Sequence, residues 1–262
     1  ATVPFISRYR KERTGGLDEV QVSAVKVQFE RLSELEKRKE TILASIDEQG
    51  KLTPELRMKI EQCYEGAPLE DLYLPYRPKR RTRATVAREK GLEPLAAMLM
   101  RQDGARPDRL AERFVGGEVH DLQEALDGAC DIIAEWVSES EAARSAMRRL
   151  FTREGVISAR VVKGKEQEGA KYSDYFDWSE PLRRVAAHRL LAMVRAEREG
   201  FIKLSVLPDE SAAVEQLERI FIKRNPSPVR TLVEAAVRDG YKRLLKPSME
   251  GETLTEDKAR AD

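Results

Sequence analysis

The most constraining feature of this sequence is an uninterrupted helical pattern between residues 18 and 49. No Gly or Pro occurs between Leu17 and Gly50, and apolar side chains recur at helical spacing. Asp18 has the side chain of a helix N-cap, and Gly50 supplies a stop signal. Such a helix is about 48 Å long, more than a small globule needs, so we expect it to brace several other elements. Its apolar stripe consists of Val25, Phe29, Leu32, Leu35, Ile42 and Ile46.

The rest of the chain repeats shorter helical patterns that are separated by Gly and Pro. Only residues 156–162, rich in β-branched side chains, and residues 201–207, which alternate in polarity, have the pattern of strands. They form either a short strand pair or two isolated extended segments. We therefore predict an all-α fold: an irregular multi-helix bundle braced by one long helix, with at most a minor short strand pair.

Changes in pattern divide the chain into three parts. Residues 1–154 form a predicted N-terminal helical domain, and residues 155–247 form a second helical region with short extended segments. Pro247 is expected to end the last helix. Residues 248–262 carry five acids and two bases and are expected to be a frayed acidic tail at the end of a truncated chain.

Composition restricts the class of protein and its compartment. Of the 262 residues, 41% are hydrophobic and 35% are charged, which excludes disorder and is typical of amphipathic helices. No apolar run is long enough to span a membrane and no signal peptide is visible, so we expect a cytoplasmic protein without membrane contact. Cys63 and Cys130 each lie on the apolar face of an expected helix. Buried, reduced thiols are favoured over a disulfide or a metal pair.

Residues typical of a catalytic or cofactor site are scarce. His120 and His188 are the only histidines, and a hydrogen-bonding role in the core or at the surface is favoured for each. No phosphate-binding loop, nucleophile elbow, paired-cysteine motif or dinucleotide-binding motif occurs. The sequence therefore predicts a protein that is not an enzyme, with no catalytic residues, no metal ligands and no cofactor.

A local excess of positive charge is the main candidate site. The total charge is balanced at +1, yet seven Lys or Arg and one acid lie between Arg77 and Lys90. Pro75 and Pro78 should hold the basic loop, residues 77–83, extended with its side chains directed outward. We expect four of these side chains, the loop cations, to contact nucleic-acid phosphates weakly and without base preference. Alternatively, the loop is solvated or pairs with acids of a neighbouring helix. The loop cations are Lys79, Arg80, Arg81 and Arg83.

Two further groups of side chains are candidates for recognition. Near the N-terminus, three cations surround Tyr9, a ring that suits a base or sugar contact as well as core packing. These N-terminal cations are Arg8, Arg10 and Lys11. The second group is the aromatic cluster, which consists of Tyr172, Tyr175, Phe176 and Trp178. It could stack on bases or hold a protein partner, but Asp174 and Asp177 argue against nucleic acid, so anchoring of the segment to adjacent helices is favoured.

Four stretches of the chain resemble the Tex family of bacterial transcription accessory proteins. They follow the family's order and together span most of the chain: residues 2–12 with 14–19, residues 69–95, residues 164–177, and residues 179–182 with 188–193. The most specific one contains the basic loop and reads Leu69-Glu-Asp-Leu-Tyr-Leu-Pro-Tyr-Arg-Pro-Lys-Arg-Arg-Thr-Arg-Ala84. Ser7 and Ala187 depart from the pattern, in which Ala and Ser are more common at the corresponding positions.

The resemblance implies an N-terminal helical region of a longer protein. Family members continue into an RNase H-like YqgF domain, helix-hairpin-helix units and a C-terminal OB-fold domain to which the principal RNA binding is attributed; none of these is visible here. The expected function is a scaffold in transcription with an auxiliary DNA or RNA backbone contact. The alternative is a protein-interaction scaffold that contacts the transcription machinery or other domains of the full-length protein and binds no nucleic acid.

Overall fold

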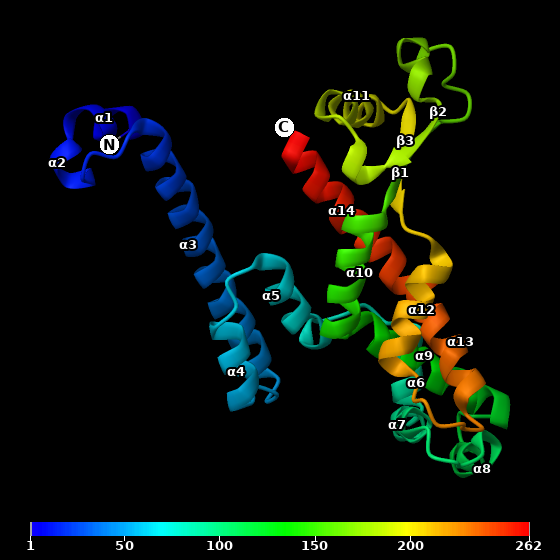
Figure 1. Ribbon diagram of the computed structural model, residues 1–262. Coiled ribbons are helices and arrows are strands. Elements are labelled where there is room, and N and C mark those ends of the chain that lie inside the picture. Colours follow the sequence, from blue (N-terminus) through cyan, green and yellow to red (C-terminus); the bar gives the residue numbers. More distant parts are fainter. Residues whose placement is uncertain (1, 262) are drawn as a thin grey trace. The chain divides into compact units, whose positions relative to one another are not determined.

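The computed structural model describes residues 2–261, with side chains described through residue 259. Helices dominate, which confirms the predicted mostly helical fold (Figure 1). Contacts divide the chain into two compact units, Ala1–Pro78 and Lys79–Asp262, called the N-terminal unit and the C-terminal unit below. Among the residues described, no helix has both the length and the apolar character that a membrane span requires.

The N-terminal unit is built around one long helix, as predicted. α3 runs unbroken through Glu19–Glu48 (blue in Figure 1). Asp18 and Gln21 form a capping box, in which the Asp18 carboxylate accepts from the Gln21 N–H at 2.8 Å and the Gln21 side chain accepts from the Asp18 N–H at 3.0 Å. Other helical elements of this unit are α1 (Val3–Tyr9), α2 (Lys11–Thr14), α4 (Pro54–Glu61), α5 (Gly66–Tyr73) and the 3-10 turn η1 (Leu74–Tyr76).

Only the C-terminal half of the predicted α3 stripe belongs to a core. Leu35, Ile42 and Ile46 are buried in a cluster with side chains of α4 and α5. In the N-terminal half, Val25 and Phe29 are 60% and 70% exposed, so this part of the predicted stripe is wrong. Helical spacing identifies the apolar face of a helix, but it does not specify whether another element covers that face.

α9 (Leu122–Glu139) is the central helix of the C-terminal unit. Its N-cap is Asp121, whose carboxylate accepts from the Glu124 N–H at 2.8 Å. The helix packs against elements that precede and follow it in the sequence. They include α6 (Arg83–Glu89), α7 (Glu93–Arg101), α8 (Pro107–Ala111), the 3-10 turn η2 (Glu112–Phe114), α10 (Glu141–Glu154), α13 (Arg230–Asp239) and the π-helical segment η5 (Gly240–Leu245).

The core of this unit crosses the domain boundary that the sequence places at residue 154. One cluster of buried side chains extends from Ala84 through Leu150 to Met249, so helices on both sides of that position share a core. α12 (Glu210–Phe221) belongs to it and packs against α10 and α13. The compact units therefore differ from the division into residues 1–154, 155–247 and 248–262, because helices distant in sequence bury their apolar faces together.

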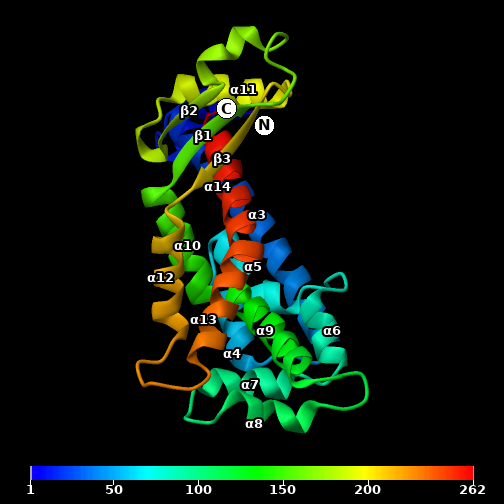
Figure 2. The same cartoon turned by 90° about the vertical axis from the view of Figure 1, so that its right-hand side faces the viewer.

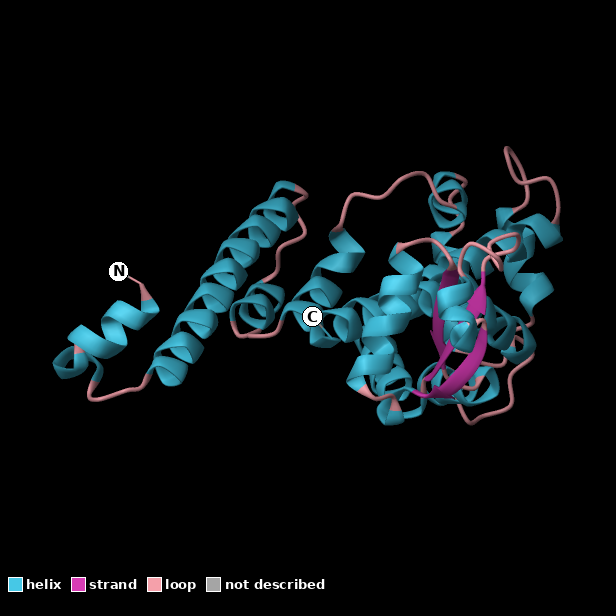
Figure 3. Cartoon of the chain, turned by 90° about the horizontal axis from the view of Figure 1, so that it is seen from above, coloured by secondary structure: helices cyan, strands magenta, loops and turns pink. Residues whose placement is uncertain are grey.

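A small antiparallel sheet has the strand order β2-β1-β3 (magenta in Figure 3). β1 (Val156–Val161) and β3 (Ile202–Leu207) form the expected strand pair, with Ala159 opposite Leu204. β2 (Asp177–Pro181), which the sequence did not predict, is a short edge strand that ends in Pro. Neighbouring elements are the 3-10 turns η3 (Ala170–Tyr175) and η4 (Leu182–Arg184) and the helix α11 (Ala187–Arg198).

The predicted frayed acidic tail is instead a packed helix. α13 continues through a π-helical segment, η5 (Gly240–Leu245), into α14 (Lys246–Ala261), which follow one another as the orange-to-red path in Figure 2. Pro247 does not end the helix, because it directly follows the π-helical segment, where the regular i→i+4 hydrogen-bond pattern is already interrupted. One face of α14 is buried at i, i+4 and i+8 spacing, by Met249, Thr253 and Asp257.

Candidate nucleic-acid interface

The loop cations lie at the start of the C-terminal unit, where the chain enters α6. Thr82 is the N-cap of α6, and its hydroxyl oxygen accepts from the Thr85 N–H at 3.1 Å. Arg83 is the first helical residue. The cap therefore fixes where the extended loop becomes helix, and with it the position of the last loop cation.

Lys79 is held by two acids of α9 and does not project freely into solvent. Its Nζ lies 3.2 Å from Glu135 Oε1 and also contacts the carboxylate of Glu139. The Lys79 side chain is 24% exposed, and the side chains of Glu135 and Glu139 are only 7% and 11% exposed. We call these two acids the acidic anchor. The predicted outward orientation is wrong for Lys79, because this ammonium group is already neutralised by a largely buried partner.

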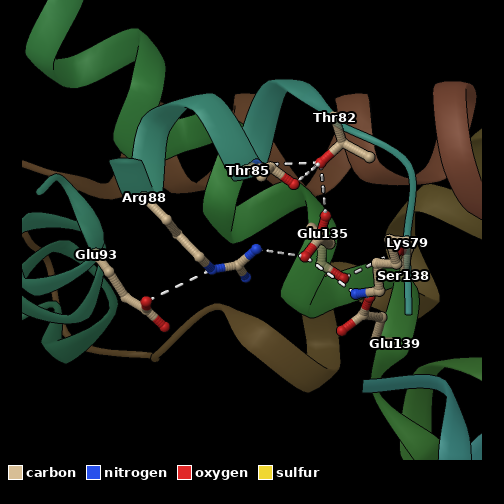
Figure 4. A network of polar contacts seen from close by, with 8 residues as sticks. All are labelled: Lys79, Thr82, Thr85, Arg88, Glu93, Glu135, Ser138 and Glu139. Carbon is tan, nitrogen blue, oxygen red and sulfur yellow. Dashed lines mark hydrogen bonds and ion pairs between the residues drawn. The ribbon is translucent and has the colours of Figure 1, made fainter. Parts of the chain in front are cut away.

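Glu135 joins the basic loop, α6 and α7 in one polar network (Figure 4). Arg88 of α6 donates from Nη1 to Glu135 Oε1 at 2.7 Å, and Thr82 donates from Oγ1 to Glu135 Oε2 at 3.2 Å. Arg88 Nε also lies 3.5 Å from Glu93 Oε2 at the start of α7. Each oxygen of the buried carboxylate thus has a donor, which is the condition for burying a charge at acceptable cost.

The two carboxylates of the acidic anchor have opposite pKa shifts. Burial alone would raise the pKa of Glu135, but the Arg88 hydrogen bond and the charges of Lys79 and Arg88 outweigh burial and hold this pKa below its usual 4.5. For Glu139, burial outweighs the Lys79 hydrogen bond and raises the pKa. Glu135 is therefore the carboxylate that keeps its charge most firmly, and it provides the negative charge that positions Lys79.

The other three loop cations are exposed. Arg81 Nη2 lies 2.9 Å from Glu89 Oε2, and with side chains 71% and 52% exposed this is a weak surface pair. Arg80 has no ion pair among the residues described. Arg83, also without an ion pair in that part of the chain, lines a groove of about 460 Å³ between α6 and α9. Three guanidinium groups are thus accessible to an anion, on a segment that the acidic anchor fixes at its start.

The N-terminal cations belong to the other unit. Arg8 is in α1, Arg10 lies between α1 and α2, and Lys11 begins α2. All three are exposed, and no buried acid within residues 2–261 contacts them. Tyr9 is 69% exposed, and its ring centroid lies 5.4 Å from that of Phe5. The structure therefore places the seven predicted site residues in two units and gives a buried partner to Lys79.

The aromatic cluster anchors its own segment, which confirms the favoured interpretation of these residues. Tyr172 is 9% exposed and belongs to a second core in the C-terminal unit, with Met193 and Ile202. The other three members are partly buried against the same core. The Tyr175 and Trp178 rings meet edge to face, with centroids 6.2 Å apart. These rings pack side chains of η3 and β2 onto the core and leave little aromatic surface for bases.

His120 and the cysteines show ordinary structural roles, whereas His188 is exposed and its side chain makes no hydrogen bond to another described residue, so the role predicted for it is not observed. Hydrogen bonds from Lys90 and His120 lower the pKa of Glu124 to about 2, and His120 Nδ1 lies 2.8 Å from Glu124 Oε2. This pair was missed in the sequence, although its i, i+4 spacing is visible there. Cys63 and Cys130 are free, partly buried thiols, and burial raises the pKa of Cys130 to about 12. No group of three or more His, Cys, Asp or Glu suited to a metal occurs among the described residues.

Comparisons with known sequences relate most of the chain to one family. Residues 102–262 match the family described as Tex central region-like, and residues 1–47 match the Tex-like protein N-terminal domain. The chain is 44% identical over 220 residues to the transcriptional accessory protein Tex of Neisseria gonorrhoeae. It is 39% identical over 267 residues to the uncharacterized protein YdcI of Bacillus subtilis, and 27% identical over 221 residues to the human S1 RNA-binding domain-containing protein 1.

These alignments cover 83%, 100% and 78% of this chain, respectively. The chain spans 29%, 37% and 21% of the length of the same three relatives. By its fold and its candidate site, the protein is mostly helical, with a basic loop that is held by a buried carboxylate. The sequence matches then identify the family: the chain belongs to the Tex family, as the resemblance predicted.

Proposed function

We propose that this chain is a non-enzymatic, cytoplasmic scaffold of a Tex-like transcription accessory protein, and that Arg80, Arg81 and Arg83 supply an auxiliary contact to nucleic-acid phosphates. One observation carries the proposal. Lys79 fixes the loop to the acidic anchor, while the three arginines that follow are exposed. Because the loop is ordered before binding, less conformational entropy is lost when it meets a ligand.

Guanidinium groups suit this task because their planar donors match phosphate oxygens in a bidentate geometry. Contacts of this kind carry no base information, so the affinity should be similar for different sequences and should fall steeply with salt. With Lys79 neutralised by acids, three cations remain in the loop. The log-log salt slope should therefore be about −2 to −3, from roughly 0.7 to 0.9 per neutralised phosphate.

The test is a titration of the purified chain against fluorescently labelled single- and double-stranded DNA and RNA at several salt concentrations. The triple variant Arg80→Ala, Arg81→Ala, Arg83→Ala should remove most of the salt slope and leave the helical circular dichroism spectrum unchanged. The matched control is Arg113→Ala, Arg183→Ala, Arg224→Ala, which removes three exposed arginines elsewhere in the C-terminal unit. Equal losses of nucleic-acid affinity in the two triple variants would show that only the net charge of the chain matters. The proposed phosphate contact by the loop would then be wrong.

A second candidate function, an interaction scaffold for protein partners, is favoured by the exposed apolar face of α3. Val25, Phe29 and Leu32 lie on one face at helical spacing and are 60%, 70% and 38% exposed, far more than a helix with a fully covered apolar stripe would show. The scaffold would then contact the transcription machinery or other domains of the full-length protein. Undetectable nucleic-acid binding at about 50 mM salt and micromolar protein, with retained fold, would favour this second function.

A further inference from the structure

A groove beside α11 combines an aliphatic floor with a cationic rim. It has a volume of about 750 Å³ and lies between α11 and η3 in the C-terminal unit. Leu191, Ala192 and Val194 contribute the aliphatic lining, and Leu191 is 40% exposed, unusually high for a large apolar side chain. Lys171, Arg195 and Arg198 place three positive charges around this surface, against the single negative charge of Glu199.

The groove already holds one carboxylate between two cations. Glu199 Oε2 lies 2.6 Å from Lys171 Nζ, and Glu199 Oε1 lies 3.1 Å from Arg195 Nε. Hydrogen bonds from Lys171, Arg195 and Tyr172 lower the pKa of Glu199 to about 2, so the chain's own carboxylate stays ionised here. Arg198 is exposed and has no ion pair among the residues described. Arg198 is thus left to bind a ligand. Beside it, Lys171 and Arg195 already bind one carboxylate, that of Glu199.

We propose that this groove is a docking site for an acidic, amphipathic peptide segment of a partner protein. Its carboxylates would pair with Arg198 and with the outer nitrogens of Arg195, and its apolar side chains would cover Leu191 and Ala192. Charge complementarity identifies the occupant, since three cations face one acid around an otherwise aliphatic surface. This surface is separate from the loop cations and does not depend on their proposed phosphate contact.

The surroundings of Tyr172 argue for a peptide and against a nucleic acid. Lys171 Nζ lies 4.8 Å from the centroid of the Tyr172 ring. The centroids of the Tyr172 and Phe201 rings are 5.9 Å apart. With Tyr172 only 9% exposed, this ring offers no free face on which a base could stack. Glu199 also interrupts the row of cations that a phosphate backbone would follow.

Another explanation for the cations is helix stabilisation. Arg195 and Arg198 occupy the last turn of α11, where positive charge offsets the helix dipole. That role predicts a change in stability and no change in binding. It gives no reason for an exposed leucine or for a groove on the same face, so binding and stability must be measured on the same variants.

The test uses the 262-residue chain and a short fluorescein-labelled peptide of Glu, Asp, Leu and Phe, with its apolar residues at helical spacing. Anisotropy should show binding in the micromolar range, with a peptide in which Gln and Asn replace the acids binding at least about tenfold more weakly. Arg198→Glu and Leu191→Glu should each weaken binding about tenfold or more. The control Arg113→Glu, an exposed arginine of η2, should have no effect.

Thermal unfolding of each variant separates binding from folding. Loss of binding at an unchanged unfolding temperature supports the docking site. An Arg198→Glu variant that loses stability but binds the peptide normally would reduce the cations to a role at the helix end. No binding of wild type at about 100 µM protein overturns the proposal. Displacement of the peptide by single-stranded RNA of equal charge, with Arg198→Glu weakening the RNA as much as the peptide, would overturn it in favour of a nucleic-acid site.

Discussion

The loop cations and the N-terminal cations are similar in sequence and differ in what lies beneath them. Lys79 contacts an acidic anchor that is almost fully buried, and Thr82 and Arg88 share the same carboxylate. Beside Arg8, Arg10 and Lys11, no buried acid is present within the described residues. A run of positive charge can therefore be part of a folded core or a purely surface feature. The charge pattern alone does not distinguish them, because the opposing acid lies far away in the sequence.

The largest expected difference between the two regions is in stability. Glu135→Gln should lower the free energy of unfolding by about 2 to 3 kcal/mol, because Lys79 and Arg88 lose the charge that compensates their partial burial. The value is below that of a fully buried pair, since both cations remain partly exposed. Urea unfolding measures it. In the N-terminal region, Glu12→Gln should change stability by less than about 0.5 kcal/mol, and equal effects of the two changes would contradict the comparison.

Nucleic-acid affinity should also separate the regions. Removing Arg80, Arg81 and Arg83 together should weaken binding by about tenfold to a hundredfold at low salt, because an ordered loop presents all three at once. Removing Arg8, Arg10 and Lys11 should have a smaller effect, with a change in the log-log salt slope of about one or less. Fluorescence titrations of the two triple variants provide the comparison. A larger effect of the N-terminal set would reverse the assignment of the main contact.

Lys79 should behave differently from the cations that follow it. Lys79→Ala should cost about 1 to 2 kcal/mol of unfolding free energy, since Glu135 and Glu139 lose a donor in a poorly solvated site. The same change at exposed Lys11 should stay within about 0.5 kcal/mol. Chemical denaturation in low and high salt checks both. A Lys79→Ala variant could be as stable as wild type and yet show a reduced salt slope of nucleic-acid binding. That result would show that Lys79 contacts phosphate and does not stabilise the fold through Glu135 and Glu139.

The smallest expected effect is the pH dependence of the anchor. The folded-state pKa of Glu135 is lowered, so its stabilisation is complete above the usual value of 4.5 and is lost as pH falls through the folded pKa. Glu139, with a raised pKa, acts in the opposite sense: its contribution is present below 4.5 and is lost as pH rises through its folded pKa. The stability difference between wild type and Glu135→Gln should therefore stay constant well above the usual pKa of 4.5 and shrink as pH falls below it.

Unfolding curves above and below this pH, with Glu12→Gln as the reference from the N-terminal region, measure that dependence. The Glu12→Gln difference should stay nearly constant, because no buried cation within the described residues contacts Glu12. A difference for Glu135→Gln that grows as pH falls would show that Glu139, and not Glu135, dominates the titration of the anchor.

Much of the local structure could be predicted from the sequence. The cap at Asp18, the absence of Gly and Pro up to Gly50 and the apolar spacing define α3 almost to the residue. Asp121 begins α9 for the same reason. These signals act within one or two helical turns and require no knowledge of the remaining fold. The prediction of a frayed tail at residues 248–262 was wrong because it rested on their net charge. The i, i+4 spacing of Met249 and Thr253 already indicated a helix face that could be buried.

By itself, the sequence determined where α3 begins and ends and where α9 begins, where positive charge gathers, and to which family the chain belongs. Only the tertiary structure decided which half of α3 is covered, that α14 packs on the core, and that Lys79 meets Glu135, 56 residues away. The physical reason is that helix formation depends on neighbours within a few residues, whereas burial and ion pairing depend on which surfaces are brought together. Lys79 and Arg80 are adjacent in the chain, and the packing of α6 against α9 alone gives the first a buried partner and leaves the second to solvent.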